Sequence, residues 1–130
     1  GLGARIAQRL DASTMLPAVG QGALGLEARL NDPLISNLVT PLICNTTTAC
    51  VTAERALSEK LGGSCSVPIG AYAQQHGEQL ELQGLVGKVD GSLVLRAQKQ
   101  GPAKDAAALG HALAEELIAQ GAQTILDELK

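Results

Sequence analysis

The sequence predicts an α+β domain whose three-stranded antiparallel sheet is covered on one face by helices. Between residues 67 and 97, apolar side chains alternate with polar ones in three short runs, which is the period of β-strands. The flanking segments repeat their apolar residues every three or four positions, as amphipathic helices do. The resulting order of helix, three strands, helix and helix is typical of a sheet with its helices gathered on one side.

The composition allows a folded core but requires it to be aliphatic. Of the 130 residues, 45% are hydrophobic, which is enough for one ordinary domain. The chain has no Phe or Trp and a single Tyr, so Leu, Ile, Val and Ala must fill the core. Because the first residue is Gly1 rather than Met and the core lacks aromatic residues, we expect a piece of a larger protein.

Charge and cysteine content narrow the possible functions. The net charge of −3 comes from interspersed acids and bases, which argues against a nucleic-acid partner. No apolar run reaches the length of a membrane span and no signal peptide is recognisable, so no membrane partner is expected. Three cysteines without Cys-x-x-Cys spacing argue against disulfides and a zinc site, so we expect no metal and a reducing cytoplasm.

The beginning of the chain predicts a helix and then a strand. A helix is predicted over 2–10, where apolar residues recur every four positions: Leu2, Ile6 and Leu10. Residues 20–25 spell G-Q-G-A-L-G, a weak match to the dinucleotide-binding fingerprint, which needs a helix beginning inside it. Alternation over 24–30 instead indicates a strand, entered through glycines that lie close to another backbone or a ligand.

Two helices are predicted before the sheet. Asp32 and Pro33 are a typical N-cap and first helical residue, and Pro41 should end the first helix. Residues 45–48, Asn-Thr-Thr-Thr, offer several N-caps for a longer helix that Gly62 stops. Its buried side should carry the apolar residues at helical spacing, Ala49, Ala53, Ala56, Leu57 and Leu61.

The strands and the C-terminal helices complete the domain. The strands are predicted over residues 67–73, 80–86 and 93–97. Pro68 indicates that the first strand lies at an edge, and turns are expected at Gly77 and Gly91. A helix after Pro102 is capped by Gly121, and a short helix follows it. The buried stripe of the longer helix should contain Leu109, Leu113 and Leu117, with Ala106 and Ala112.

Cys65 is the main candidate for chemistry. It lies in the stretch Gly62-Gly63-Ser64-Cys65-Ser66, where a helix ends and a strand begins, so its small neighbours should leave the sulfur uncovered. The alternative is that Cys65 is a small apolar residue packed in a loop. No acid–base pair, Ser/His/Asp set or phosphate loop is visible, so a lone thiol points to covalent attachment rather than to turnover by cysteine alone.

Other reactive residue types have simpler interpretations. Cys44 and Cys50 sit beside apolar neighbours at a helix margin, and we expect both to be buried packing residues. His76 lies in a turn without a second ligand at metal spacing, so it should be solvated. Glu54 and Arg55 are interpreted as a structural ion pair or a solvated helix face.

Three segments of the chain resemble the porphobilinogen deaminase family, also called hydroxymethylbilane synthases. They are L-P-A-V-G-Q-G-A-L-G-L-E at 16–27, T-A-E-R-A at 52–56 and G-S-C-S-V-P-I-G-A-Y at 63–72. In this order and at this separation they are highly specific, and the resemblance extends over essentially the whole chain. One departure is Ser64, which stands where many relatives have a glycine and so requires backbone angles open to other residues.

The resemblance implies a three-domain protein of which this chain is the last part. Residues 1–19 would be the end of the second domain and a hinge, and 20–31 the strand that returns to the first domain. Residues 32–130 would be the complete C-terminal cofactor-attachment domain. Without its sheet, the strand from Ala23 is expected to be disordered, to pack differently or to pair with another chain.

The resemblance also implies a cofactor and a reaction. By residue match, Cys65 would hold a dipyrromethane through a thioether, with Ser64, Gln21 and Gly22 beside the bound pyrroles. The full enzyme would be a transferase of haem and other tetrapyrrole biosynthesis. It joins four porphobilinogen molecules to this primer with loss of ammonia and then releases hydroxymethylbilane. We expect it to be a cytoplasmic monomer.

The resemblance places part of the machinery outside this chain. The catalytic aspartate and most of the basic residues that bind pyrrole carboxylates would belong to the missing domains. No catalytic residue is therefore expected here, and the chain alone should be inactive. Two other functions remain open at this point: a non-enzymatic α+β interaction module with a packing cysteine, and a dinucleotide-binding fragment.

Overall fold

The computed structural model describes residues 1–63 and 67–128, and it confirms the predicted α+β class. The α-helices are α1 (Pro33–Val39), α2 (Asn45–Lys60), α3 (Ala106–Ala119) and α4 (Ala122–Asp127). The strands are β1 (Ile69–His76), β2 (Gln79–Gly87) and β3 (Val94–Pro102), and short 3-10 helices are η1 (Gly3–Arg5), η2 (Thr40–Leu42) and η3 (Ala103–Asp105). Each predicted strand is present and runs past its predicted end.

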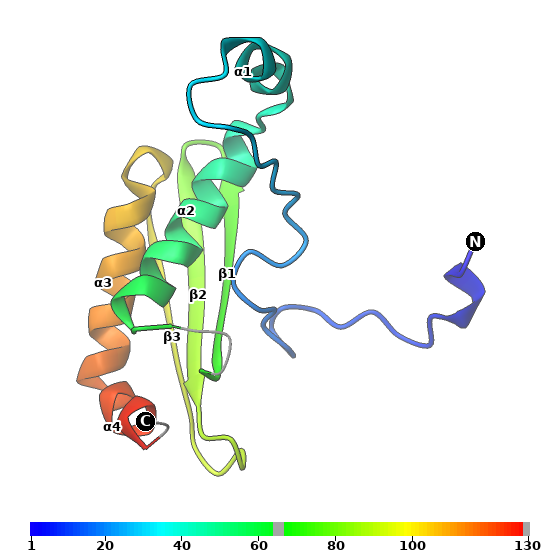
Figure 1. Cartoon of the computed structure of the whole chain (residues 1–130). Helices are drawn as coiled ribbons and strands as arrows, with labels where there is room; N and C mark the ends of the chain where they lie inside the picture. The colour runs from blue at the N-terminus through cyan, green and yellow to red at the C-terminus, as the bar shows by residue number, and fades with distance from the viewer. Residues whose placement is uncertain (64–66, 129–130) are drawn as a thin grey trace.

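The sheet is antiparallel and has the order β1-β2-β3, so β1 lies at an edge as predicted. Ala71 on β1 pairs with Gly84 on β2, which in turn pairs with Ala97 on β3. Both connecting turns contain a glycine in the left-handed region, Gly77 at φ 63° and Gly91 at φ 73°. Helices α2 and α3 lie side by side over one face of the sheet (Figure 1).

The core between the helices and the sheet is aliphatic, as the composition requires. Its largest fully buried side chains are Leu57, Leu80, Leu82, Leu113, Leu117, Ile125 and Val86. Gly110 lets α2 and α3 pack closely, because a Cβ at this position would overlap the Ala53 carbonyl oxygen and lie 2.8 Å from the Ala56 Cβ. The absence of aromatic bulk is thus offset by close contact between the two helices.

The N-terminal segment lacks the helix and the strand that its periodicity predicts, although the strand was expected to be disordered or packed differently without its sheet. Residues 2–10 form only the single turn η1, and residues 24–30 form no strand. Leu2 is 72% exposed and Leu24 is 96% exposed, so neither segment has a partner that buries its apolar side chains. Helices shorter than about 12 residues are marginal without such packing, and a strand needs a neighbour for its backbone hydrogen bonds.

The two helices before the sheet meet at a sharp bend. Asp32 caps α1 as predicted, its Oδ1 accepting the Ile35 N–H at 3.1 Å. The N-cap of α2 is Cys44 rather than one of residues 45–48, because Cys44 is extended and its carbonyl accepts the Thr48 N–H at 2.9 Å.

Within the described ranges no single helix is long and apolar enough to cross a membrane. Two helical segments together have the length and composition of a membrane span, Pro33–Leu42 and Asn45–Lys60, but they are bent by 97° relative to each other.

Candidate functional site

The end of α2 is a Schellman motif that leads the chain into residues 64–66, the predicted loop around Cys65 (here called the cysteine loop). The Gly62 N–H donates to the Glu59 carbonyl at 3.0 Å, and the Gly63 N–H donates to the Ser58 carbonyl at 2.8 Å. Gly62 has a φ of 68°, a left-handed conformation that side chains with a Cβ rarely adopt. A Cβ on Gly63 would overlap the Ser58 side chain. The two glycines are therefore required for the exit from the helix.

On the other side of this loop, the start of β1 is anchored by packing and by a backbone hydrogen bond. Val67 is half-buried and packs against the core, and the Pro68 carbonyl accepts the Gly87 N–H at 3.1 Å. Residues 64–66, which include the predicted site residues Ser64 and Cys65, lie outside the described residues. The helix-to-strand junction is confirmed on both flanks, and the uncovered sulfur of Cys65 stays a prediction.

Gln21 and Gly22, the other predicted site residues, lie in a tight double turn. The Gln21 N–H donates to the Ala18 carbonyl at 3.0 Å, and the Gln21 Oε1 accepts the Ala18 N–H at 3.0 Å. Gly20 and Gly22 have φ values of 71° and 86°. A Cβ on either glycine would meet nothing within 4 Å, so the left-handed backbone, rather than a close approach within this chain, requires glycine here.

Glu54 is the buried charged residue of the described structure, so its interpretation as an ion-paired or solvated residue is wrong. Its side chain is not ion-paired in the described ranges. Instead, Oε2 accepts the Gly20 N–H at 2.7 Å and Oε1 accepts the Ala73 N–H at 2.8 Å. Arg55 cannot pair with it on the helix, because adjacent residues do not face each other. The signal in the sequence was the position of Glu54 between Ala53 and Leu57, both on the buried stripe.

The segment before the double turn covers the free edge of β1. Leu16 is buried, Val19 packs against the core, and the Pro17 carbonyl accepts the Ala71 N–H at 3.2 Å. Figure 1 shows this segment passing beside β1, on the side away from β2. The Ala71 and Ala73 N–H groups, which β2 does not use, are thereby both satisfied, and this blunts the sheet edge.

Of the two described cysteines, Cys44 differs from the prediction, whereas Cys50 packs against the core as expected but is only half-buried. Cys44 is exposed, and hydrogen bonding from the Thr47 hydroxyl, followed by that from the Thr47 N–H, lowers the pKa of its thiol. Cys50 is half-buried against the core, and this burial, followed by the nearby Glu54 charge, raises the pKa of its thiol. The expectation of a buried Cys44 is wrong, because α1, which precedes it, lies beyond the end of the sheet and does not cover it (Figure 1).

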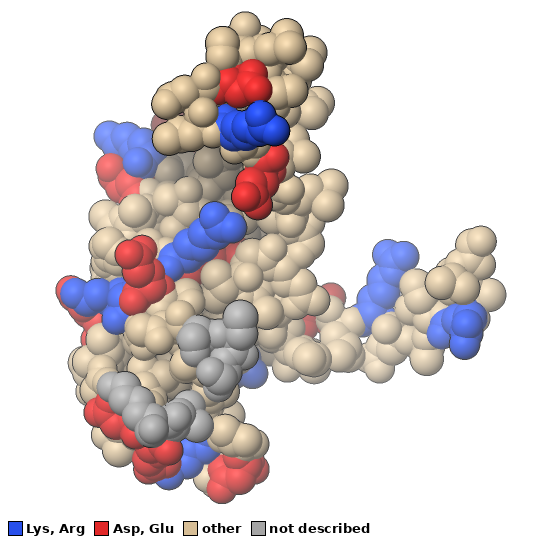
Figure 2. Space-filling model, in the orientation of Figure 1, with Lys and Arg blue, Asp and Glu red and all other residues tan. Residues whose placement is uncertain are grey.

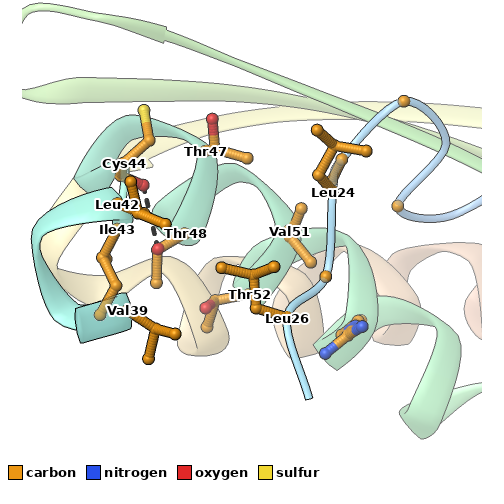
Figure 3. A pocket seen from close by; sticks show the side chains of 15 residues that line it. Leu24, Leu26, Val39, Leu42, Ile43, Cys44, Thr47, Thr48, Val51 and Thr52 are labelled. Atoms are coloured by element: carbon orange, nitrogen blue, oxygen red, sulfur yellow. Dashed lines mark hydrogen bonds between the residues drawn. The ribbon is translucent and has the colours of Figure 1, made fainter. Parts of the chain in front are cut away.

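An open cavity of about 640 Å³ lies along the N-terminal half of α2, far from the junction at the other end of the helix. Figure 3 shows Leu24 and Leu26 near Val51 and Thr52 of α2, with Val39, Leu42 and Ile43 farther along the cavity. Gly22 lines it, whereas the glycines that flank the cysteine loop do not. The G-Q-G-A-L-G stretch at its rim begins no helix, so it lacks the context that a dinucleotide site needs.

The surface carries no strong charge of one sign on the face that Figure 2 shows, where acidic and basic side chains are interspersed. The ion pairs of the described residues are Lys60–Glu115, Lys88–Glu128 and Lys99–Glu116, all partly exposed. His76 is exposed, as predicted. Within 1–63 and 67–128, no three His, Cys, Asp or Glu side chains are grouped so that they could hold a metal ion.

Comparison with known proteins agrees with this organisation. A family model described as "Porphobilinogen deaminase, C-terminal domain" matches residues 48–119, from the first turn of α2 to the end of α3. Proteins named porphobilinogen deaminase from Methylobacillus flagellatus and Thiobacillus denitrificans are each 48% identical over 129 residues, or 99% of the chain. One from Laribacter hongkongensis is 45% identical over all 130 residues. The chain spans 42% of the length of each of these relatives. It belongs to the porphobilinogen deaminase family and corresponds to the C-terminal portion.

Proposed function

We propose that this chain is the cofactor-carrying part of a hydroxymethylbilane synthase, a transferase of haem and tetrapyrrole biosynthesis. The observation that carries the proposal is the identity of 45–48% with proteins named porphobilinogen deaminase along nearly the whole chain. That alignment includes the stretch with Cys65, for which the residues alone suggested covalent attachment. The substrate would be porphobilinogen, and the full enzyme would act as a monomer in the cytoplasm.

In this proposal Cys65 attaches a dipyrromethane. The Cys65 sulfur would bond to the aminomethyl carbon of a porphobilinogen unit as the C–N bond of that carbon breaks. The amino group would leave as ammonia and take up the thiol proton, and the new C–S bond would be the thioether. When bound, the dipyrromethane supplies the primer to which porphobilinogen units are joined with loss of ammonia. Ser64 of the same loop would contact the cofactor, and Gln21 and Gly22 would lie beside the bound pyrroles.

The residues around the junction fit a tethered group but not a complete binding site. The Schellman motif and the anchored Pro68 hold both ends of the cysteine loop, which suits an attachment point that must not move. From Leu61 to Ile69 the chain contains no Lys or Arg. The acidic side chains of a dipyrromethane would therefore need cations from elsewhere, and we assign most of these to the part of the enzyme that precedes this chain.

The domain boundaries follow the same reasoning. Residues 1–19 would end the second domain and form a hinge, 20–31 would return to the first domain as a strand, and 32–130 would form the third domain. The exposed apolar side chains of the first two segments support this proposal: Leu2, Ile6, Leu10, Met15, Leu24, Leu26 and Leu30. The cavity beside Leu24 would then be filled or reshaped in the full protein, so we do not assign it a ligand.

The decisive experiment is intact-mass measurement of the full-length protein, with Cys65→Ser and Cys44→Ser variants. We expect the wild type and Cys44→Ser to carry the added mass of a dipyrromethane, and Cys65→Ser to lose it. Cys44→Ser is a matched control, because it changes an exposed thiol at the opposite end of α2. Ehrlich's reagent, which colours pyrroles, gives the same comparison on denatured protein. An adduct that survives Cys65→Ser, or a wild type without any adduct, would contradict the proposal.

A further inference from the structure

Glu54 joins three elements that are separate in the sequence. It lies in α2, its Oε1 accepts the Ala73 N–H of β1 at 2.8 Å, and its Oε2 accepts the Gly20 N–H of the double turn at 2.7 Å. Only 6% of the residue is exposed. No cation lies within salt-bridge distance of it in the described part of the chain, so two backbone N–H groups compensate the carboxylate.

This arrangement is specific for a carboxylate of this length. Both of its partners are donors, and a carboxylate offers only acceptors, whereas an amide would turn an NH₂ group toward one of them. A buried donor left without an acceptor is costly, so both contacts depend on the same side chain. Simple packing of α2 on the sheet needs neither of them, because the apolar stripe of α2 already provides it.

The contacts connect the two halves of the proposed site. Gly20 directly precedes Gln21 and Gly22, which the resemblance places beside the bound pyrroles. Ala73 lies in β1, and Glu54 lies in α2, the two elements that hold the ends of the cysteine loop. The carboxylate thus connects the double turn itself with the α2–β1 unit, in addition to the Pro17–Ala71 hydrogen bond just before the turn.

We propose that Glu54 is a positioning residue, whose carboxylate sets the placement of the Gly20–Gly22 turn relative to the junction that carries Cys65. The inference rests on the proposed function, since it gives this placement a role in turnover. Loss of one contact would let the turn shift while α2, β1 and the thioether stay in place. Misplacement of a reacting group by about 1 Å can lower a rate by about two orders of magnitude.

The test uses the full-length enzyme with Glu54→Gln and Glu54→Asp. Glu78→Gln is the matched control, because it makes the same change on an exposed side chain in the β1–β2 turn. Intact mass reports cofactor loading, amide hydrogen exchange at Gly20 and Ala73 reports the two contacts, and steady-state kinetics with porphobilinogen separates kcat from KM. Rates are expressed per cofactor-loaded molecule, so that lost folding or loading does not count as lost positioning.

For Glu54→Gln we expect faster exchange at Gly20 or Ala73, retained cofactor and a kcat lowered about tenfold or more, with KM changed much less. Glu54→Asp keeps the charge but is one methylene group shorter, so we expect it to keep one of the two contacts. Its kcat should lie between those of Glu54→Gln and the wild type. It also provides the test if the amide variant does not fold. Glu78→Gln should match the wild type. A loaded Glu54→Gln or Glu54→Asp enzyme with wild-type kcat overturns the positioning role. A wild type without a pyrrole adduct overturns the proposed function itself, whatever the exchange data show.

Discussion

The Gly63 N–H donates a hydrogen bond of 2.8 Å to the Ser58 carbonyl, and this contact ends α2 within three residues of the cysteine loop. It is possible only because the preceding residue, Gly62, adopts a left-handed conformation at φ 68°. The direction in which the chain leaves the helix is therefore set by two glycines rather than by packing of side chains.

Gly62→Ala should destabilise the domain by about 1–2 kcal/mol, because a Cβ is strained in the left-handed region even where space is free. The measurement is equilibrium urea unfolding of this chain. Gly25→Ala is the control, since Gly25 has no positive φ and a Cβ there meets nothing within 4 Å. Equal midpoints for the Gly62→Ala variant and the wild type would show that the helix exit does not need this conformation.

Gly110→Ala should cost about 1–3 kcal/mol, because the added methyl group would force α2 and α3 apart. Ala108→Ser, which also adds one heavy atom but on an exposed position of α3, should change the free energy of unfolding by about 0.5 kcal/mol or less. Thermal unfolding of both variants provides the comparison. An unchanged melting temperature for Gly110→Ala would mean that the helices can separate without loss.

Cys44 should react with iodoacetamide faster than Cys50 near neutral pH. The pKa of the Cys44 thiol is lowered, so more of it is thiolate below its ordinary pKa, whereas the pKa of Cys50 is raised and its sulfur is half-buried. Rates would be measured for this chain as a function of pH by mass spectrometry of the separate peptides.

The pH profile of Cys44 alkylation should rise at lower pH than that of Cys50. Thr47→Val removes the hydroxyl that lowers the pKa of Cys44 most, so it should shift the Cys44 profile upward and leave that of Cys50 in place. Identical profiles for the two cysteines in the wild type would contradict this assignment.

Leu24→Ala should have little effect on the stability of this chain but should destabilise the full-length protein. In this chain Leu24 is 96% exposed, so its truncation should change stability by about 0.5 kcal/mol or less. In the full-length protein, where residues 20–31 are proposed to pair as a strand, the same change should cost about 2 kcal/mol or more.

Leu113→Ala serves as the reference for the Leu24 comparison. Leu113 is fully buried here, so its truncation should cost about 2–5 kcal/mol in both proteins. If urea unfolding showed Leu24→Ala to be neutral in the full-length protein as well, the proposed return strand would be wrong.

Part of the site followed from local patterns and part did not. The end of α2 at Gly62 and the start of β1 near Pro68 could be predicted, because glycine and proline act on the backbone of their own segment. The partners of Glu54 could not, since its contacts to Gly20 and Ala73 lie 34 and 19 residues away. The exposure of Cys44 depends in the same way on where α1 and η2 turn, which the apolar residues around it do not reveal.

The sequence alone determined the order of helices and strands from residue 45 onward and the family to which the chain belongs. Those features arise from short-range periodicity, from turn residues and from the spacing of motifs, all of which can be read along one dimension. Only the tertiary structure decided that the predicted N-terminal helix and strand do not form, and that a carboxylate on α2 connects β1 with the turn at Gly20. The physical reason is that these outcomes depend on which surfaces and donors meet in space, and a segment without a packing partner does not keep its local preference.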